Sequence, residues 1–168
     1  MAASGETAER RRRHAAYYLR LAEKAEPQLW GPQQGVWLAR LEAEHPNLRT
    51  ALTWSLQAGE GATGLRLAGA LWQFWVVRGH YSEGRGWLEE ILARSGEAAA
   101  AVRAKALRGA DALARRQGDY GRATVLYEEA LALHRHLGET RGIASALKAL
   151  GDVACERLAL AAYRAANI

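Results

Sequence analysis

Histidine, cysteine and acidic side chains are the groups in this 168-residue chain that could carry catalysis or hold a metal ion. His134 and His136 are two positions apart, which places their imidazoles about 200° apart on a helix, so they cannot share a metal ion. His80 lies beside Glu83 in a turn, but no serine or cysteine nucleophile is placed to use it. Cys155 has no histidine near it in the sequence, and we expect a buried or half-buried thiol. These spacings form no catalytic set, and they predict a non-enzymatic protein with no metal site and no cofactor.

A glycine pattern in residues 58–64, Gly59-x-Gly61-x-x-Gly64, matches the dinucleotide-binding fingerprint in its letters. That fingerprint needs a β-strand before it and an acidic residue about 20 residues after it. A helical pattern precedes the glycines here. We therefore interpret them as the end of a helix followed by a flexible turn.

Composition and charge narrow the classes of partner. The net charge is +5 with a pI near 9.7, but much of the excess is the run Arg10–Arg13, which we interpret as the solvated start of a helix. We expect no nucleic-acid partner, and phosphate binding by this run is the alternative.

The chain has no apolar run near the roughly 20 residues of a membrane span, and Met1–Arg13 has no signal-peptide core. With one cysteine and so no internal disulfide, the sequence predicts a cytoplasmic protein.

The elements that must position any site are helical. Ala, Leu, Arg and Glu dominate the composition and no alternating strand pattern is present, which predicts an all-α protein. Residues 104–137 have the pattern of two amphipathic helices joined by the turn Gln117–Tyr120. Gly118 is placed like a residue that ends a helix, and Asp119 like the N-cap of the next one.

This helical hairpin recurs along the chain. Its turn, Gly118-Asp119-Tyr120, superimposes on Gly79-His80-Tyr81 after a shift of 39 residues, and a shift of 40 the other way superimposes Leu107 on Leu147. A fixed period of this size predicts a stack of hairpins, because one hairpin cannot bury its apolar face alone. The sequence predicts a disordered N-terminus at residues 1–7 and an N-terminal helical cap at residues 8–57. Residues 62–168 are predicted to form about two and a half repeats, at about 65–94, 102–137 and 141–168, of which the last is incomplete.

The repeated pattern resembles the tetratricopeptide repeat (TPR). The central repeat matches it at Leu107, Ala114, Gly118, Tyr120, Ala123, Tyr127, Ala130 and Leu131. Asp111 stands where glycine is usual, and in the preceding repeat Trp72 and Trp75 occupy small-residue positions while Gly84 replaces alanine. The resemblance implies an α-α superhelix of stacked antiparallel hairpins whose concave face, formed by the first helices, binds a protein or peptide.

A narrower likeness covers residues 11–94. Its most specific part is the string Glu44-His45-x-Asn47-Leu48-Arg49, with Trp37 and Trp54 nearby. This segment is similar to the region that follows the nucleotide-binding and winged-helix modules of bacterial signal-transduction ATPases, including LuxR-type and AfsR-like transcriptional regulators. The resemblance implies a sensor and scaffold that binds an inducer or partner and restrains the ATPase. The chain contains no Walker A, Walker B or helix-turn-helix signature, so the resemblance implies the sensor arm alone, either as a stand-alone gene product or as a fragment. An ATPase or winged-helix regulator is the partner that the resemblance implies.

The repeat frame places a mainly cationic set of side chains on the concave face of the first helices: Arg66, Gln73, Lys105, Arg108, Arg115, Ser145, Lys148 and Asp152. We expect this surface to bind an acidic peptide or helix, steered by charge.

Three tryptophans crowd one layer of the predicted stack: Trp72, Trp75 and Trp87. We interpret them as core packing between neighbouring hairpins. The alternative is the wall of a small-ligand pocket, because glycines nearby leave space: Gly69, Gly84 and Gly86.

The last residues are apolar where a capping helix would be polar. Four of them would form an unfinished face: Leu158, Leu160, Tyr163 and Ile168. This face predicts a homodimer through the C-terminal helix.

Overall fold

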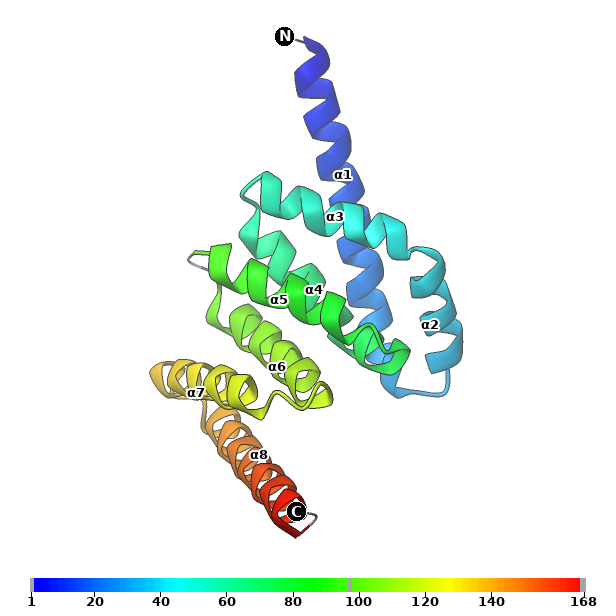
Figure 1. Cartoon of the computed structure of the whole chain (residues 1–168). Helices are drawn as coiled ribbons and strands as arrows, with labels where there is room; N and C mark the ends of the chain where they lie inside the picture. Colours follow the sequence, from blue (N-terminus) through cyan, green and yellow to red (C-terminus); the bar gives the residue numbers. More distant parts are fainter. Residues whose placement is uncertain (1, 97, 167–168) are drawn as a thin grey trace.

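The computed structural model describes residues 2–96 and 98–166, and every regular element in this part of the chain is a helix (Figure 1). The elements in order are α1 (Ala2–Ala25), the short 3-10 helix η1 (Glu26–Trp30), α2 (Gln34–Ala43), α3 (His45–Gln57), α4 (Gly61–Arg78), α5 (Tyr81–Arg94), α6 (Ala100–Arg116), α7 (Tyr120–Leu137) and α8 (Thr140–Ala166). The predicted all-α class is confirmed.

Glycines with left-handed backbone follow α4 and α6, where the sequence predicts turns. Gly79 has a φ of 78° and Gly118 a φ of 73°, a region that a Cβ atom makes costly. Asp119 then caps α7, because its carboxylate accepts a hydrogen bond of 3.1 Å from the backbone N–H of Arg122. The left-handed glycine and the capping carboxylate act on residues within one turn of the chain, so the turn forms where the sequence predicts it.

Successive hairpins pack on their neighbours in chain order. α4, α6 and α8 begin at Gly61, Ala100 and Thr140, which are 39 and 40 residues apart. α4 packs on α5 and α6, α6 on α7, and α7 on α8, as Figure 1 shows from green through yellow to red. This is the nearest-neighbour packing that stacked hairpins require. A regular TPR superhelix stays a prediction.

The centre of the packing is α4, which contacts α1, η1, α2, α3, α5 and α6. Residues 64–75 of this helix are all buried apart from Arg66. A helix that is covered on every side is apolar all round, which accounts for the run of tryptophan, phenylalanine and leucine in its sequence. Trp75 and Phe74 are the largest of the fully buried side chains.

The N-terminal helices pack on this centre, since α1 and α3 contact each other and both contact α4. α1 begins at Ala2, so it includes residues 2–7, for which the sequence predicts disorder. Its exposed Arg10 and Arg13 pair with Glu6 and Glu9, one helical turn before each of them. Pairs at this spacing support a helix, and Figure 1 shows this end of α1 projecting beyond the other helices.

The long helix α8 ends the described part of the chain. It continues unbroken through residues 158–160, where the repeat pattern would require a turn that the sequence lacks. Ala146 and Val153 are the buried residues of this helix. Among the described helices, α7 is the one that packs on α8 and covers one side of it, so most of the surface of α8 is exposed to solvent.

Candidate functional site

A hollow of about 760 Å³ lies between α6, α7 and α8, and we call it the α6–α8 groove. Three cationic side chains line it: Lys105, Arg108 and Arg141. The rest of the lining consists of small residues, Ala101, Ala104, Ala130, Gly142, Ser145 and Ala146, together with Tyr127, His134, Glu139 and Thr140. The structure therefore brings together three residues of the predicted binding face, Lys105, Arg108 and Ser145, and adds Arg141.

Four of the predicted groove cations already pair with carboxylates of the same chain. The pairs are Arg66 with Glu23 at 2.7 Å, Lys105 with Glu26 at 2.5 Å, Arg115 with Glu156, and Lys148 with Asp152 at 3.7 Å. Gln73, predicted for the same face, is buried. The surface is consequently less basic than its sequence indicates, since each carboxylate offsets one positive charge.

Arg108 differs from these cations. It is exposed, and no carboxylate in the described ranges forms an ion pair with it. Its guanidinium lies instead over the Trp72 ring, 5.5 Å from the ring centroid, in a cation–π contact. Its charge therefore remains available to an acidic group from outside the chain.

A second hollow, of about 510 Å³, adjoins this contact and is lined by Trp72, Gln73, Arg115 and Glu156. Trp30 of η1 lines it too, with its ring centroid 5.9 Å from that of Trp72. Trp30 is 63% exposed, which is unusual for a side chain of this size. Sequence reasoning missed it, and its only signal is its place directly before the Gly31-Pro32 turn.

The other predicted tryptophans have packing surroundings. Trp75 is 1% exposed, and the space that Gly84 leaves is filled by its ring. Trp87 packs against the core while partly buried. This arrangement favours the packing interpretation for Trp75, whereas Trp72 is both packed and in contact with a hollow.

The helix α6 also carries a buried carboxyl group, that of Asp111. Asp111 is 1% exposed, and burial raises its pKa to about 7 although the Tyr127 hydroxyl donates to it and Arg115 attracts it. Its Oδ1 has no hydrogen-bond partner among the described residues. Burial and the hydrogen bond to Asp111 also raise the pKa of Tyr127. The pKa of Arg115 is also raised, and its hydrogen bond to Glu156 is the largest cause.

The C-terminal residues lie on the open side of α8. Leu158 is 71% exposed and Tyr163 68%, while Leu160 is partly buried. Ile168, predicted for the same face, lies outside the described residues. Cys155 is exposed, so the expectation of a buried or half-buried thiol is wrong, because α8 lacks a second helix to cover it.

The string from Glu44 to Arg49 forms a junction between helices. The Glu44 carboxylate accepts hydrogen bonds of 2.8 Å from the Tyr18 hydroxyl of α1 and from the Asn47 side chain. Burial, followed by this bond, raises the pKa of Tyr18 to about 12. Arg49 reaches forward to α5 and donates to Glu83 at 2.7 Å and 2.5 Å. The most specific residues of the sequence likeness thus hold α1, α3 and α5 together.

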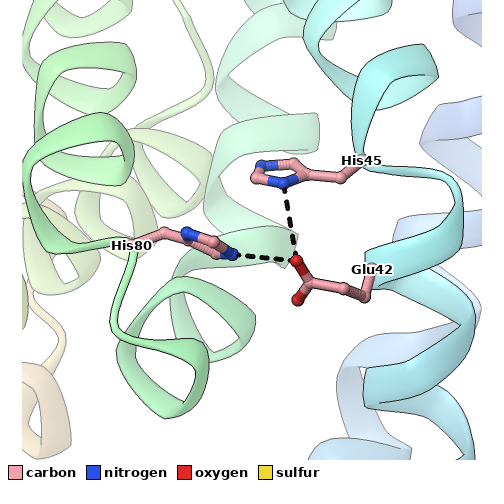
Figure 2. Close-up of side chains that lie close together, drawn as sticks. All are labelled: Glu42, His45 and His80. Carbon is pink, nitrogen blue, oxygen red and sulfur yellow. Dashed lines mark hydrogen bonds and ion pairs between the residues drawn. The ribbon is translucent and has the colours of Figure 1, made fainter.

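Beside this junction Glu42, His45 and His80 lie together (Figure 2). The Nε2 atom of His80 is 3.2 Å from Glu42 Oε1, and His45 Nδ1 is 4.0 Å from the same oxygen. Burial holds the pKa of His45 below its ordinary value, against the attraction of Glu83. Burial opposes the charge of Glu83 too, but the bonds from Arg49 hold the pKa of its carboxyl low. The sequence predicts no such cluster, because His45 and His80 belong to different hairpins.

The remaining candidates stay apart. His134 pairs with Glu139 at 2.8 Å instead of joining His136. In the arginine run, Arg10 pairs with Glu6, Arg12 with Glu60 and Arg13 with Glu9.

No helix among the described residues has the length and apolar character needed to cross a membrane.

Sequence comparisons place the chain beside bacterial regulators. It is 33% identical over 147 residues to a protein named "Putative HTH-type transcriptional regulator" from Mycobacterium bovis, and equally to proteins of that name from two strains of Mycobacterium tuberculosis. The match covers 83% of this chain and 17% of each relative, so the chain spans about a sixth of their length. No family model matches the chain, and no solved structure gives a significant match. The chain is therefore similar to a segment of proteins named as transcriptional regulators, in agreement with the narrower resemblance, while the TPR assignment stays a prediction.

Proposed function

We propose that this chain is a non-enzymatic interaction arm of a bacterial transcriptional regulatory system, and that its α6–α8 groove binds an acidic segment of a protein partner. The similarity to a segment of HTH-type regulators supports the regulatory setting. An ATPase or winged-helix regulator is the partner that the resemblance implies.

The proposed binding mode rests on the observation that Arg108 is exposed and forms no ion pair within the described part of the chain. Most cations of the predicted face have an internal carboxylate, but Arg108 has an aromatic ring as its neighbour. A carboxylate that approaches the groove can pair with Arg108 without displacing an existing ion pair. The alanines beside it accept an apolar side chain, so an amphipathic segment with acidic and apolar faces fits this surface.

Fluorescence anisotropy with two labelled helical peptides tests this proposal. Both carry leucine and alanine on one face, and the other face carries glutamate in one peptide and lysine in the other. The wild-type chain should bind the glutamate peptide more tightly, with an affinity that falls as salt is raised. Arg108→Glu should weaken this binding by about tenfold.

The matched control is Arg20→Glu, which makes the same charge change at an exposed position of α1. It should leave the affinity nearly unchanged. Equal binding of both peptides, or equal losses in the two variants, would show that general charge and not the groove is responsible.

A further inference from the structure

Three potential metal ligands meet where two interhelical corners touch. Glu42 belongs to the last turn of α2, His45 is the first residue of α3, and His80 is the N-cap of α5. Each offers one ligand atom, and these atoms lie within 4.8 Å of one another. Figure 2 shows both rings directed at the Glu42 carboxylate from separate parts of the fold. The set therefore depends on the docking of the N-terminal helices against the first hairpin.

The separations are close to those of a metal site. Ligand atoms at about 2.0 to 2.1 Å from a tetrahedral zinc ion lie roughly 3.3 to 3.4 Å from each other. His80 Nε2 and Glu42 Oε1 are 3.2 Å apart, which already meets this requirement. His45 Nδ1 is 4.0 Å from the same oxygen. All three ligand atoms lie within 4.8 Å of one another, so the side chains must draw together to hold an ion.

The surroundings of His45 are those of an oriented metal ligand. Its Nε2 lies 3.1 Å from Glu83 Oε1, and Glu83 is itself held by two bonds from Arg49. When Nε2–H donates to this carboxylate, Nδ1 carries the lone pair that faces Glu42. The Phe74 ring, 5.3 Å away and nearly perpendicular, fixes the imidazole from the core side. Ligating histidines commonly have such a carboxylate behind them.

The site is open on one side. The side chains of Glu42 and His80 are 41% and 29% exposed, while that of His45 is 8% exposed. An ion can therefore enter from solvent and keep a water molecule as a fourth ligand. The second oxygen of Glu42, Oε2, is buried with no hydrogen-bond partner in the described residues, and Arg78 Nε lies 3.4 Å from it.

We propose that Glu42, His45 and His80 bind a divalent metal ion of the zinc type, with Glu83 and Arg49 as the residues that position His45. Two imidazoles and one carboxylate form a donor set that suits Zn²⁺, and three protein ligands leave one coordination position for water. The bound ion joins the α2–α3 corner to the α4–α5 turn, so it links the N-terminal helices to the first hairpin. This site is independent of the α6–α8 groove.

The experiment is a titration of the purified, metal-free chain with Zn²⁺ against a chromophoric chelator. We expect one zinc ion per chain, and His80→Asn should weaken its binding by at least about tenfold, since it removes a ligand while asparagine is favourable at the N-cap position of α5. Glu83→Gln keeps all three ligands but weakens the hold on His45, so it should cost about 10- to 100-fold. Circular dichroism of each variant establishes that it is folded.

The control is His134→Asn, which removes a close histidine–glutamate pair that lies outside this cluster, His134 with Glu139. It should leave zinc affinity unchanged. Two further readouts separate a built site from loose surface binding. Co²⁺ should give the visible absorption of a tetrahedral complex in the wild-type chain and not in His80→Asn, and zinc at a hundredfold excess over Kd should raise the Tm by roughly 5 to 10 °C.

Absence of zinc binding by the wild-type chain overturns the proposal. Zinc binding that survives His80→Asn and Glu83→Gln unchanged also overturns it, because the metal would then be held elsewhere. Loss of affinity in His134→Asn of the same size as in His80→Asn has the same meaning.

Discussion

Gly84 of α5 lies against the indole of Trp75 of α4 so closely that a Cβ atom at Gly84 would be 2.6 Å from Trp75 Cδ2. A similar relationship joins the next pair of helices, where a Cβ at Gly109 would be 2.7 Å from Trp72 Cβ. In both cases a tryptophan at a position that is small in the repeat pattern faces a glycine. The large and the small residue compensate each other, and the helices pack without extra separation.

Gly84→Ala should destabilise the chain by about 1 to 3 kcal/mol, because the added methyl group must displace a buried ring. Urea unfolding followed by circular dichroism measures this change. Alanine is the better helix former by nearly 1 kcal/mol, so a net loss can come only from the clash.

Gly86→Ala in the same helix is the control. A Cβ at Gly86 meets no atom within 4 Å, so this variant should be more stable by about 0.5 to 1 kcal/mol. The same change in stability for both variants would contradict the packing of Trp75 on Gly84.

The stability of the chain should depend on pH through Asp111. Burial raises the pKa of this carboxyl group to about 7 in the folded chain, well above its ordinary value of 3.8. Between these values the folded state holds a proton that the unfolded state releases, so stability falls as pH rises from about 4 to 7 and is level above that. Tyr127 and Arg115 favour the charged form and Glu156 opposes it.

Asp111→Asn removes this titration while it keeps the size of the side chain and an acceptor for Tyr127. The wild-type chain should lose about 1 to 2 kcal/mol relative to the variant between pH 4 and pH 7, less than the upper bound of about 4 kcal/mol that the full shift implies. Urea unfolding of both chains at each pH measures the difference. A difference that is constant across this range would mean that Asp111 does not bind a proton near neutrality.

Self-association through α8 is the third prediction. Leu147 and Leu158 are 49% and 71% exposed, and eleven residues correspond to about three helical turns, so both lie on one face. Burying this face against a second copy removes apolar surface from water, and we expect a concentration-dependent dimer in sedimentation velocity. Leu158→Glu should shift the equilibrium to the monomer.

Ser145→Glu places the same side chain on α8 about 140° around the helix from Leu158, also at an exposed position. It should leave the dimer intact. A wild-type chain that sediments as a monomer at the highest attainable concentration would rule out this interface.

The sequence by itself determined the features that depend on near neighbours. Gly118 and Asp119 specify a turn because a left-handed glycine and a capping carboxylate act within a few residues. The recurrence of apolar residues specifies helices of defined phase, so the all-α class and the hairpin period followed from it. The exception among the local features is residues 2–7, where small and polar residues suggested disorder but α1 includes them.

Only the tertiary structure decided which cationic side chains lack an internal carboxylate and which potential metal ligands meet. Repeat phase placed Lys105 and Arg108 on one face, but it could not indicate that Glu26, 79 residues earlier, neutralises Lys105 while Arg108 rests on Trp72. It likewise could not bring Glu42 and His45 to His80, because that encounter requires the α2–α3 corner to dock on the α4–α5 turn. Periodicity reports which side of a helix is buried, whereas pairings between distant side chains depend on how helices from different hairpins are packed.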